Sequence, residues 1–81
     1  MFALKYSRRF KKDLKPYRHN KGLLVKLEKV LDILAAGEDL PLKNNNHRLI
    51  GEFKDCFECH LEPDILLIYK IEKAEVIILS L

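Results

Sequence analysis

The 81-residue sequence has no tryptophan, one methionine, three glycines and three prolines, and it has no long hydrophobic run. The longest apolar run, residues 65–69, is far shorter than the roughly 20 residues that a membrane-spanning helix needs. The first ten residues lack the apolar stretch of a secretory signal, so we expect a cytoplasmic protein. With 48% hydrophobic residues the chain is too apolar to be disordered. It is also too short for two domains, and we expect a single domain over residues 1–81.

Cysteine is also scarce, and both cysteines stand in the string Cys56-Phe57-Glu58-Cys59-His60, which matches the C-x-x-C-H pattern of haem attachment. Haem attached in this way belongs to exported proteins, and Met1 is the only methionine available as an axial ligand. In a strand, residues three apart face opposite sides of the sheet, so the two thiols cannot reach one metal ion. We therefore expect two reduced cysteines and no haem, zinc or other cofactor.

The net charge of +3 hides an uneven distribution. The first 29 residues carry ten lysines or arginines and two acidic residues, whereas the remaining 52 carry five and ten. A positive block of this density favours binding to phosphate backbones or to an acidic protein partner. The alternative is that these side chains only solvate the outer faces of helices.

The hydrophobic pattern predicts a short strand and two helices in the first half of the chain. Residues 2–6 alternate as in a strand and end at Ser7, a favourable helix N-cap. Apolar residues then recur at helical spacing among arginines and lysines: Phe10, Leu14 and Tyr17. After a short break, residues 23–34 form a second amphipathic pattern, which Gly37 ends. Helices joined by so short a connection are expected to form a hairpin.

The second half of the chain predicts strands after a polar loop over residues 38–46. The expected strands are 48–53, which is weak because Gly51 interrupts it, 56–62, 65–71 and 76–81. The third of these is almost continuously apolar, which is typical of a central strand covered on both faces. We expect an α+β fold in which a helical hairpin packs on a four- to five-stranded, mainly antiparallel sheet, in the order β-α-α-β-β-β-β.

Imidazole and carboxylate groups gather in this second half, at His47, Glu58, His60 and Asp64. Glu58 and His60 share a strand face because they are two residues apart, and Asp64 lies beyond the turn, where it can fold back. Imidazoles beside carboxylates are the usual groups for proton transfer near neutral pH. A histidine considered alone is more often structural, with a carboxylate that merely satisfies it. Together with a cationic helix, the group fits cleavage of a polyanion.

The segment from His47 to Lys54, followed by the segment from Phe57 to Tyr69, resembles the core of the RelE/ParE toxin superfamily, most closely its YafQ-type branch. The resemblance extends over almost the whole chain. It implies a RelE-like fold and a toxin of a type II toxin–antitoxin system. Such toxins are ribosome-dependent endoribonucleases that cut mRNA without a metal ion, and an acidic antitoxin holds each of them inactive.

The same resemblance implies that His47, His60 and Asp64 are catalytic positions, with Glu58 a weaker candidate. The reaction is the attack of a ribose 2′-OH on its own 3′-phosphate, which needs a base, an acid and positive charge near the phosphorane. We expect His60 to act as acid or base, with Asp64 orienting it or pairing with it. His47 is then a second proton donor or a phosphate contact, and the division of roles between the histidines stays open.

Basic side chains close to the histidine and carboxylate group, and others on the first helix, are candidates for binding RNA. Arg48 and Lys54 are candidate phosphate contacts. On the first helix, Arg8, Arg9 and Lys12 are expected to contact ribosomal RNA phosphates or the antitoxin. For each of them a solvated surface position is the alternative.

The sequence departs from the family after the last strand, where the family pattern continues into a segment with an arginine and a further histidine. Because Leu81 is the last residue, we expect weakened activity: one lost preorganised cation can cost on the order of 10²–10³ in rate. Two other functions stay open. One is a catalytically inactive or ParE-like protein that acts by binding an antitoxin or another protein, and the other is a basic nucleic-acid-binding module without chemistry.

Overall fold

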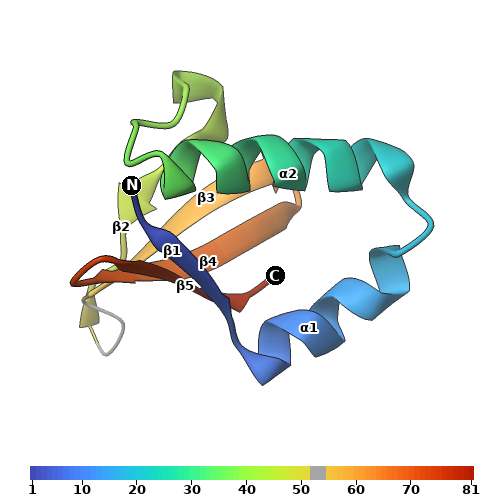
Figure 1. Ribbon diagram of the computed structural model, residues 1–81. Coiled ribbons are helices and arrows are strands. Elements are labelled where there is room, and N and C mark those ends of the chain that lie inside the picture. Colours follow the sequence, from blue (N-terminus) through green and yellow to red (C-terminus); the bar gives the residue numbers. More distant parts are fainter. Residues whose placement is uncertain (52–54) are drawn as a thin grey trace.

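The computed structural model describes residues 1–51 and 55–81, and in this part of the chain five strands form one sheet with two α-helices beside it (Figure 1). The elements in chain order are β1 (Ala3–Tyr6), α1 (Arg8–Leu14), the 3-10 helix η1 (Lys15–Tyr17), α2 (Lys21–Ala35), the 3-10 helix η2 (Leu42–Asn44), β2 (His47–Arg48), β3 (Cys56–Glu62), β4 (Ile65–Glu72) and β5 (Glu75–Ser80). None of the described helices has the length and apolar character needed to cross a membrane.

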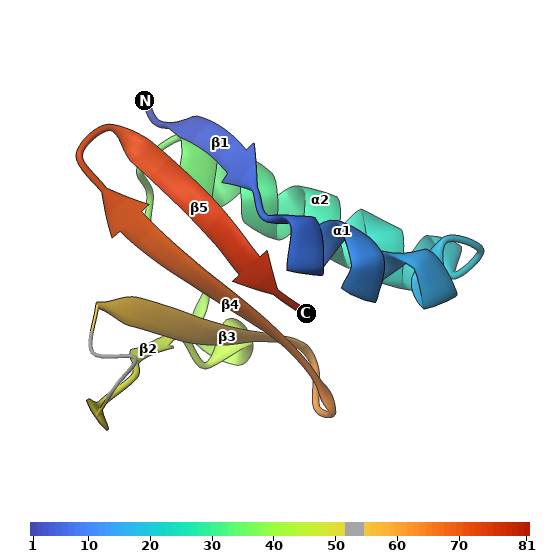
Figure 2. The ribbon, with the colours of Figure 1, turned by 90° about the horizontal axis from the view of Figure 1, so that it is seen from below.

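The strands lie in the order β1-β5-β4-β3-β2. β1 runs parallel to β5, and every other neighbouring pair is antiparallel. Figure 2 shows the consequence: β1 and α1 lie at one side of the sheet and β2 at the other. The expected α+β fold with a mainly antiparallel sheet is confirmed.

Both helices begin at a capping side chain: Ser7, as the sequence predicts, and Asn20, which lies in the expected break between the helices. The Ser7 hydroxyl accepts a hydrogen bond from the Phe10 N–H (2.9 Å) and donates to the Leu79 carbonyl (2.7 Å), which ties the start of α1 to β5. The Asn20 side-chain oxygen accepts from the Leu23 N–H (3.1 Å) at the start of α2. These bonds satisfy N–H groups that a helix leaves unpaired in its first turn.

The end of α2 also follows the sequence pattern. Gly37 has φ +74°, and the N–H of Glu38 donates to the Ile33 carbonyl (3.1 Å), which is the hydrogen bond of a left-handed helix cap. A Cβ at Gly37 would lie 3.0 Å from the ring of Phe2. Glycine is therefore needed here both for its backbone conformation and for the close approach of Phe2, the residue before β1.

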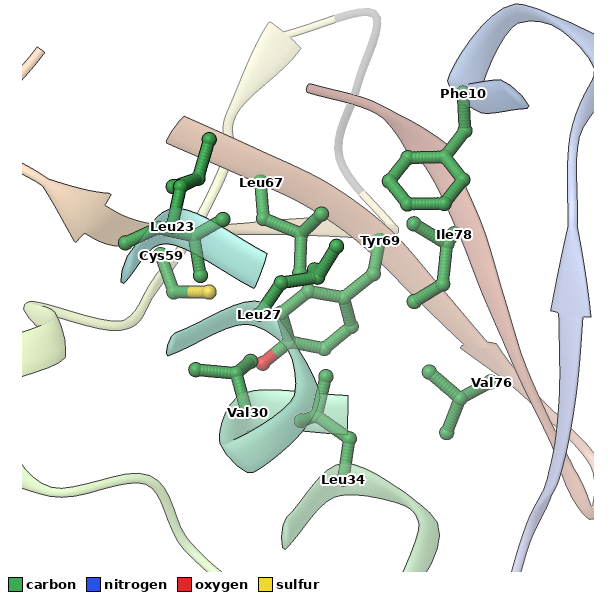
Figure 3. Close-up of a cluster of buried hydrophobic side chains, with 11 residues drawn as sticks. Phe10, Leu23, Leu27, Val30, Leu34, Cys59, Leu67, Tyr69, Val76 and Ile78 are labelled. Atoms are coloured by element: carbon green, nitrogen blue, oxygen red, sulfur yellow. The ribbon is translucent and has the colours of Figure 1, made fainter. Parts of the chain in front are cut away.

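The hydrophobic core lies between α2, α1 and one face of the sheet (Figure 3). Its buried members are Phe10, Leu23, Leu27, Val30, Leu34, Cys59, Leu61, Leu67, Tyr69, Val76 and Ile78. The expectation that β4 is covered on both faces is wrong for the part of the chain that the structure describes. The side chains of Leu66 and Ile68, on the face away from the core, are only half-buried, because no described helix packs there.

The strand expected over residues 48–53 is also different: β2 contains only His47 and Arg48. Gly51 has φ +80°, a left-handed conformation that a strand cannot contain, and Ile50 is 88% exposed. Pairing therefore stops where the backbone turns away from β3. Residues 52 and 53 of the predicted strand, and Lys54 after it, lie outside the described part of the chain.

Candidate functional site

His47 lies between two hydrogen-bond acceptors. β2 pairs with β3 so that His47 is directly opposite Glu58, and His47 Nε2 is 3.3 Å from Glu58 Oε1. On the other side of the ring, Nδ1 is 3.0 Å from the carbonyl oxygen of Asn45. Carbonyl and carboxylate oxygens only accept hydrogen bonds, so the doubly protonated imidazolium satisfies both contacts. The His47 side chain is 45% exposed and can therefore be reached from solvent.

His60, in β3, faces a donor instead. The side-chain amide nitrogen Nδ2 of Asn45 is 3.4 Å from His60 Nε2. An amide NH₂ group only donates, so this contact matches a neutral ring with its lone pair on Nε2 and its proton on Nδ1. The His60 backbone is fixed by Asn44, whose Nδ2 donates to the His60 carbonyl (2.8 Å). The two histidines thus occupy opposite hydrogen-bonding environments around one residue, Asn45.

The residues that organise this arrangement are the three consecutive asparagines before β2. Asn45 has φ +46°, a left-handed conformation that asparagine adopts more readily than most residues. This conformation lets its backbone contact His47 while its side chain contacts His60. Asn46 accepts a hydrogen bond from the Tyr69 hydroxyl (2.7 Å). The sequence predicts only a loop for this run, although asparagine favours such turns.

Tyr69, in β4, holds the asparagine run through its hydrogen bond to Asn46. Its ring is 1% exposed, and burial raises the pKa of the phenol to about 12, with the neighbouring Cys59 adding to the rise and the Asn46 hydrogen bond opposing it. The phenol is therefore neutral at physiological pH and can donate its proton to Asn46. Phe57 stacks on the Tyr69 ring, with centroids 5.4 Å apart.

Arg48 lies next to His47 on the same strand. Its guanidinium carbon is 5.3 Å from the centroid of the Phe57 ring, a distance at which cations and aromatic faces attract. The side chain is exposed, and its charge lies at the same edge of the sheet as His47. Lys54, the other cation expected here, lies outside the described residues.

Asp64 does not pair with His60 in the part of the chain that the structure describes. It lies in the turn between β3 and β4 and is exposed. Within residues 1–51 and 55–81, its carboxylate forms no hydrogen bond or ion pair. Glu58, the weaker candidate from the sequence, is instead the carboxylate that contacts a histidine.

The cations of α1 lie away from both histidines. Arg8, Arg9 and Lys12 follow β1, whereas His47 is in β2 at the opposite edge of the sheet (Figure 2). Four strand spacings of about 4.8 Å put these edges roughly 19 Å apart. All three side chains are exposed, and Arg9 Nε lies 3.7 Å from Asp13. The structure thus separates this cationic helix from the histidine pair.

The cysteines are buried and unbridged. Cys59 is in the core, and burial raises the pKa of its thiol to about 12, with Glu58 adding to the rise. A thiol with such a pKa is protonated at neutral pH, so it is a poor nucleophile and metal ligand. Within the described ranges, no three His, Cys, Asp or Glu side chains gather as a metal site would require.

Comparison with known families identifies the family of this chain. Residues 2–81 match the family described as "Bacterial toxin of type II toxin-antitoxin system, YafQ". The chain belongs to the YafQ toxin family. Its RelE-like fold and its place among the toxins of type II toxin–antitoxin systems, both expected from the sequence, are confirmed.

Similar proteins support the assignment of this chain to the YafQ toxin family. The "Putative toxin YafQ" of Haemophilus influenzae is 32% identical over 68 residues, which are 80% of this chain and 67% of that protein. A metal-bound toxin from Helicobacter pylori is 38% identical, with a TM-score of 0.88 over 99% of this chain and 91% of that one. YafQ in the DinJ-YafQ complex of E. coli is 27% identical, with a TM-score of 0.87 over 99% and 90% of the two chains.

Proposed function

We propose that this YafQ-family toxin is a cytoplasmic, ribosome-dependent mRNA endoribonuclease that an acidic antitoxin holds inactive. The observation that carries the proposal is the placement of His47 and His60 on either side of Asn45, one ring between acceptors and the other facing a donor. One site then holds a proton donor and a proton acceptor, which is the pair that attack by a 2′-OH needs. The antitoxin is inferred from the E. coli relative, whose structure is a DinJ-YafQ complex.

In the proposed reaction, His60 Nε2 takes the proton of the ribose 2′-OH as the hydroxyl oxygen attacks the adjacent phosphorus. The contact of Nε2 with Asn45 is long at 3.4 Å, so the incoming hydroxyl can replace it. The bond from phosphorus to the 5′-oxygen then breaks, and His47 gives its proton to that oxygen. The products are a 2′,3′-cyclic phosphate and a 5′-hydroxyl, and no metal ion is required.

Cations complete the proposed site. Arg48 is exposed beside His47 and would stabilise the negative charge of the phosphorane. Lys54 is proposed as a second phosphate contact on its place in the sequence alone. Asp64, exposed in the turn four residues after His60, is proposed to position the substrate rather than the His60 ring.

The test is cleavage of a short mRNA on purified ribosomes by variants of each histidine. We expect His60→Ala and His47→Ala each to lower the rate by about 10²-fold or more, the usual contribution of a positioned acid or base. The matched control is His19→Ala, which removes an exposed histidine in the connection between α1 and α2. Thermal unfolding of each variant checks that the fold is retained.

Two results would contradict the proposal. Cleavage by His60→Ala at the rate of the unmodified protein would remove this ring from the reaction. An unmodified protein that binds an acidic antitoxin but cuts no ribosome-bound mRNA would instead indicate a toxin fold that acts by binding alone.

A further inference from the structure

Two stacked aromatic rings contact the chain on both sides of His47. On one side, the Asn46 side-chain oxygen accepts a hydrogen bond from the Tyr69 hydroxyl (2.7 Å). On the other side, the guanidinium carbon of Arg48 lies 5.3 Å from the centroid of the Phe57 ring. The two rings belong to β4 and β3, and they stack with their centroids 5.4 Å apart and their planes at 15°. One support therefore contacts both the residue before His47 and the residue after it.

The aromatic pair is anchored in the core, whereas β2 is not. In the described part of the chain β2 lies at the edge of the sheet, has two exposed residues and pairs with β3 only over these. Short segments with few buried contacts are the ones that open most readily. Tyr69 is 1% exposed, and Phe57 packs against the core cluster. Side-chain contacts that reach from these rings to β2 therefore matter for how firmly the strand is held.

Phe57 and the ring of His47 lie on opposite faces of the sheet. Phe57 and Glu58 are consecutive residues of β3, so their side chains point to opposite faces. The His47 ring lies on the Glu58 side, with 3.3 Å between Nε2 and Oε1. Any influence of Phe57 on the His47 ring must therefore pass through β2 rather than through a direct contact.

We propose that Phe57 is a positioning residue for His47. Its ring holds the Arg48 guanidinium by a cation–π contact, and this contact keeps β2, and with it His47, in place. The attraction needs an aromatic face, because the ring presents negative charge above its plane and an aliphatic side chain does not. It equally needs the cation, so Phe57 and Arg48 act as a pair. The consequence for cleavage rests on the proposed function, whereas the placement of the His47 ring does not.

The test compares Phe57→Leu with Phe57→Tyr in the whole chain. Leucine keeps the site apolar but has no aromatic face, whereas tyrosine keeps the face. In Phe57→Leu we expect the NMR signals of the His47 ring to shift, while those of His60, whose carbonyl Asn44 holds separately, stay in place. On ribosome-bound mRNA the same variant should lower kcat by about tenfold with KM nearly unchanged, as misplacing a catalytic group does. Phe57→Tyr should restore both the signals and kcat.

A double-variant cycle separates the pair from a general packing effect of the ring. Arg48→Gln should shift the His47 ring signals as Phe57→Leu does, and the combined variant should shift them no further, because each change removes the same contact. The matched control is Phe2→Leu, which shortens another half-buried phenylalanine of the core, next to β1 at the opposite edge of the sheet. It should lower stability and leave the His47 signals unchanged.

Three results would overturn the proposal. Unchanged His47 signals in a folded Phe57→Leu variant would show that the ring does not hold β2. Equal shifts in Phe57→Leu and Phe57→Tyr, or additive shifts in the cycle, would assign Phe57 to packing alone. If leucine at position 57 prevents folding, Arg48→Gln decides instead, because Arg48 is exposed: unchanged His47 signals there would also overturn the proposal. The ring signals need no ribosome, so failure of the ribonuclease proposal would appear separately, as absent cleavage with the expected signal pattern.

Discussion

At the scale of single residues, Asn45 determines how the two histidines differ. Its carbonyl contacts His47 and its amide contacts His60, and both contacts depend on a left-handed backbone. Few residues other than glycine adopt that backbone without strain. A substitution that keeps this backbone conformation but changes the side-chain donor therefore tests the hydrogen bond to His60 alone.

The Asn45→Asp variant should reverse the preference of His60. Aspartate keeps the tolerance for positive φ and the carbonyl contact with His47, but it exchanges an amide donor for a carboxylate acceptor. We expect the proton of His60 to move to Nε2, visible in the ring nitrogen chemical shifts, and the cleavage rate to fall by about tenfold or more. Asn45→Gly should leave His60 without a preferred tautomer.

The ring signals of His19 are an internal reference for this experiment, because that residue is exposed and far along the chain from the asparagine run. Unchanged His60 ring shifts in Asn45→Asp would show that the amide does not set the tautomer. A change at His19 of the same size would point to a general structural effect.

At the scale of elements, side-chain hydrogen bonds at both ends of the asparagine run, Asn44 to Asn46, hold it to the sheet. Asn44 donates to the His60 carbonyl in β3, and Tyr69 in β4 donates to Asn46. The short strand β2 has only two residues to pair with β3. The side-chain hydrogen bonds therefore help to fix the position of β2, in which His47 lies opposite Glu58.

Tyr69→Phe removes one of these bonds without removing the ring. We expect a loss of about 1 kcal/mol in the free energy of unfolding at neutral pH, the usual net value of one hydrogen bond. The pKa of Tyr69 is raised from 10.0 to about 12 in the fold, so its neutral form is stabilised there. As pH rises from 10 to 12, the unfolded chain loses this proton before the folded chain does, and stability falls.

The variant should lack that part of the alkaline loss, so the stability curves of the two proteins should converge over this pH range. Urea unfolding at neutral pH and across pH 10–12 measures both effects. Parallel curves with no convergence would show that Tyr69 ionises at the same pH in both states.

Much of the architecture could be predicted because it follows from local patterns. Ser7 and Gly37 mark helix ends through backbone chemistry, and the strands of the second half carry clear apolar runs. The histidine site could be predicted only in part. The pairing of His47 with Glu58 depends on the register of β2, and the roles of the asparagines depend on contacts across the sheet. Neither leaves a periodic signal in the sequence.

At the scale of the whole molecule, the α1 cations and His47 lie at opposite edges of the sheet. The basic first part of the chain forms α1 and α2, and the α1 cations lie beyond β1. Long-range attraction to a polyanion can therefore act on a surface different from the one that holds the histidines.

Charge reversal at Arg8, Arg9 and Lys12 tests this separation. We expect ribosome affinity to fall, and to fall more at low salt than at high salt, because exposed charges are screened within about 10 Å at 0.1 M ionic strength. Sedimentation binding at two salt concentrations measures the effect. Equal affinity of variant and unmodified protein at both would assign these side chains to solvation of the helix.

The parallel pairing of β1 with β5 determines when the sheet can form during synthesis of the chain. Ala3 pairs with Glu75, so β1 has no neighbour among the described strands until the elements between it and β5, and β5 itself, have been synthesised. Pairing over such a sequence separation forms late, since the intervening chain must be ordered first. A nascent copy therefore cannot place β1 in the sheet until β5 has been synthesised.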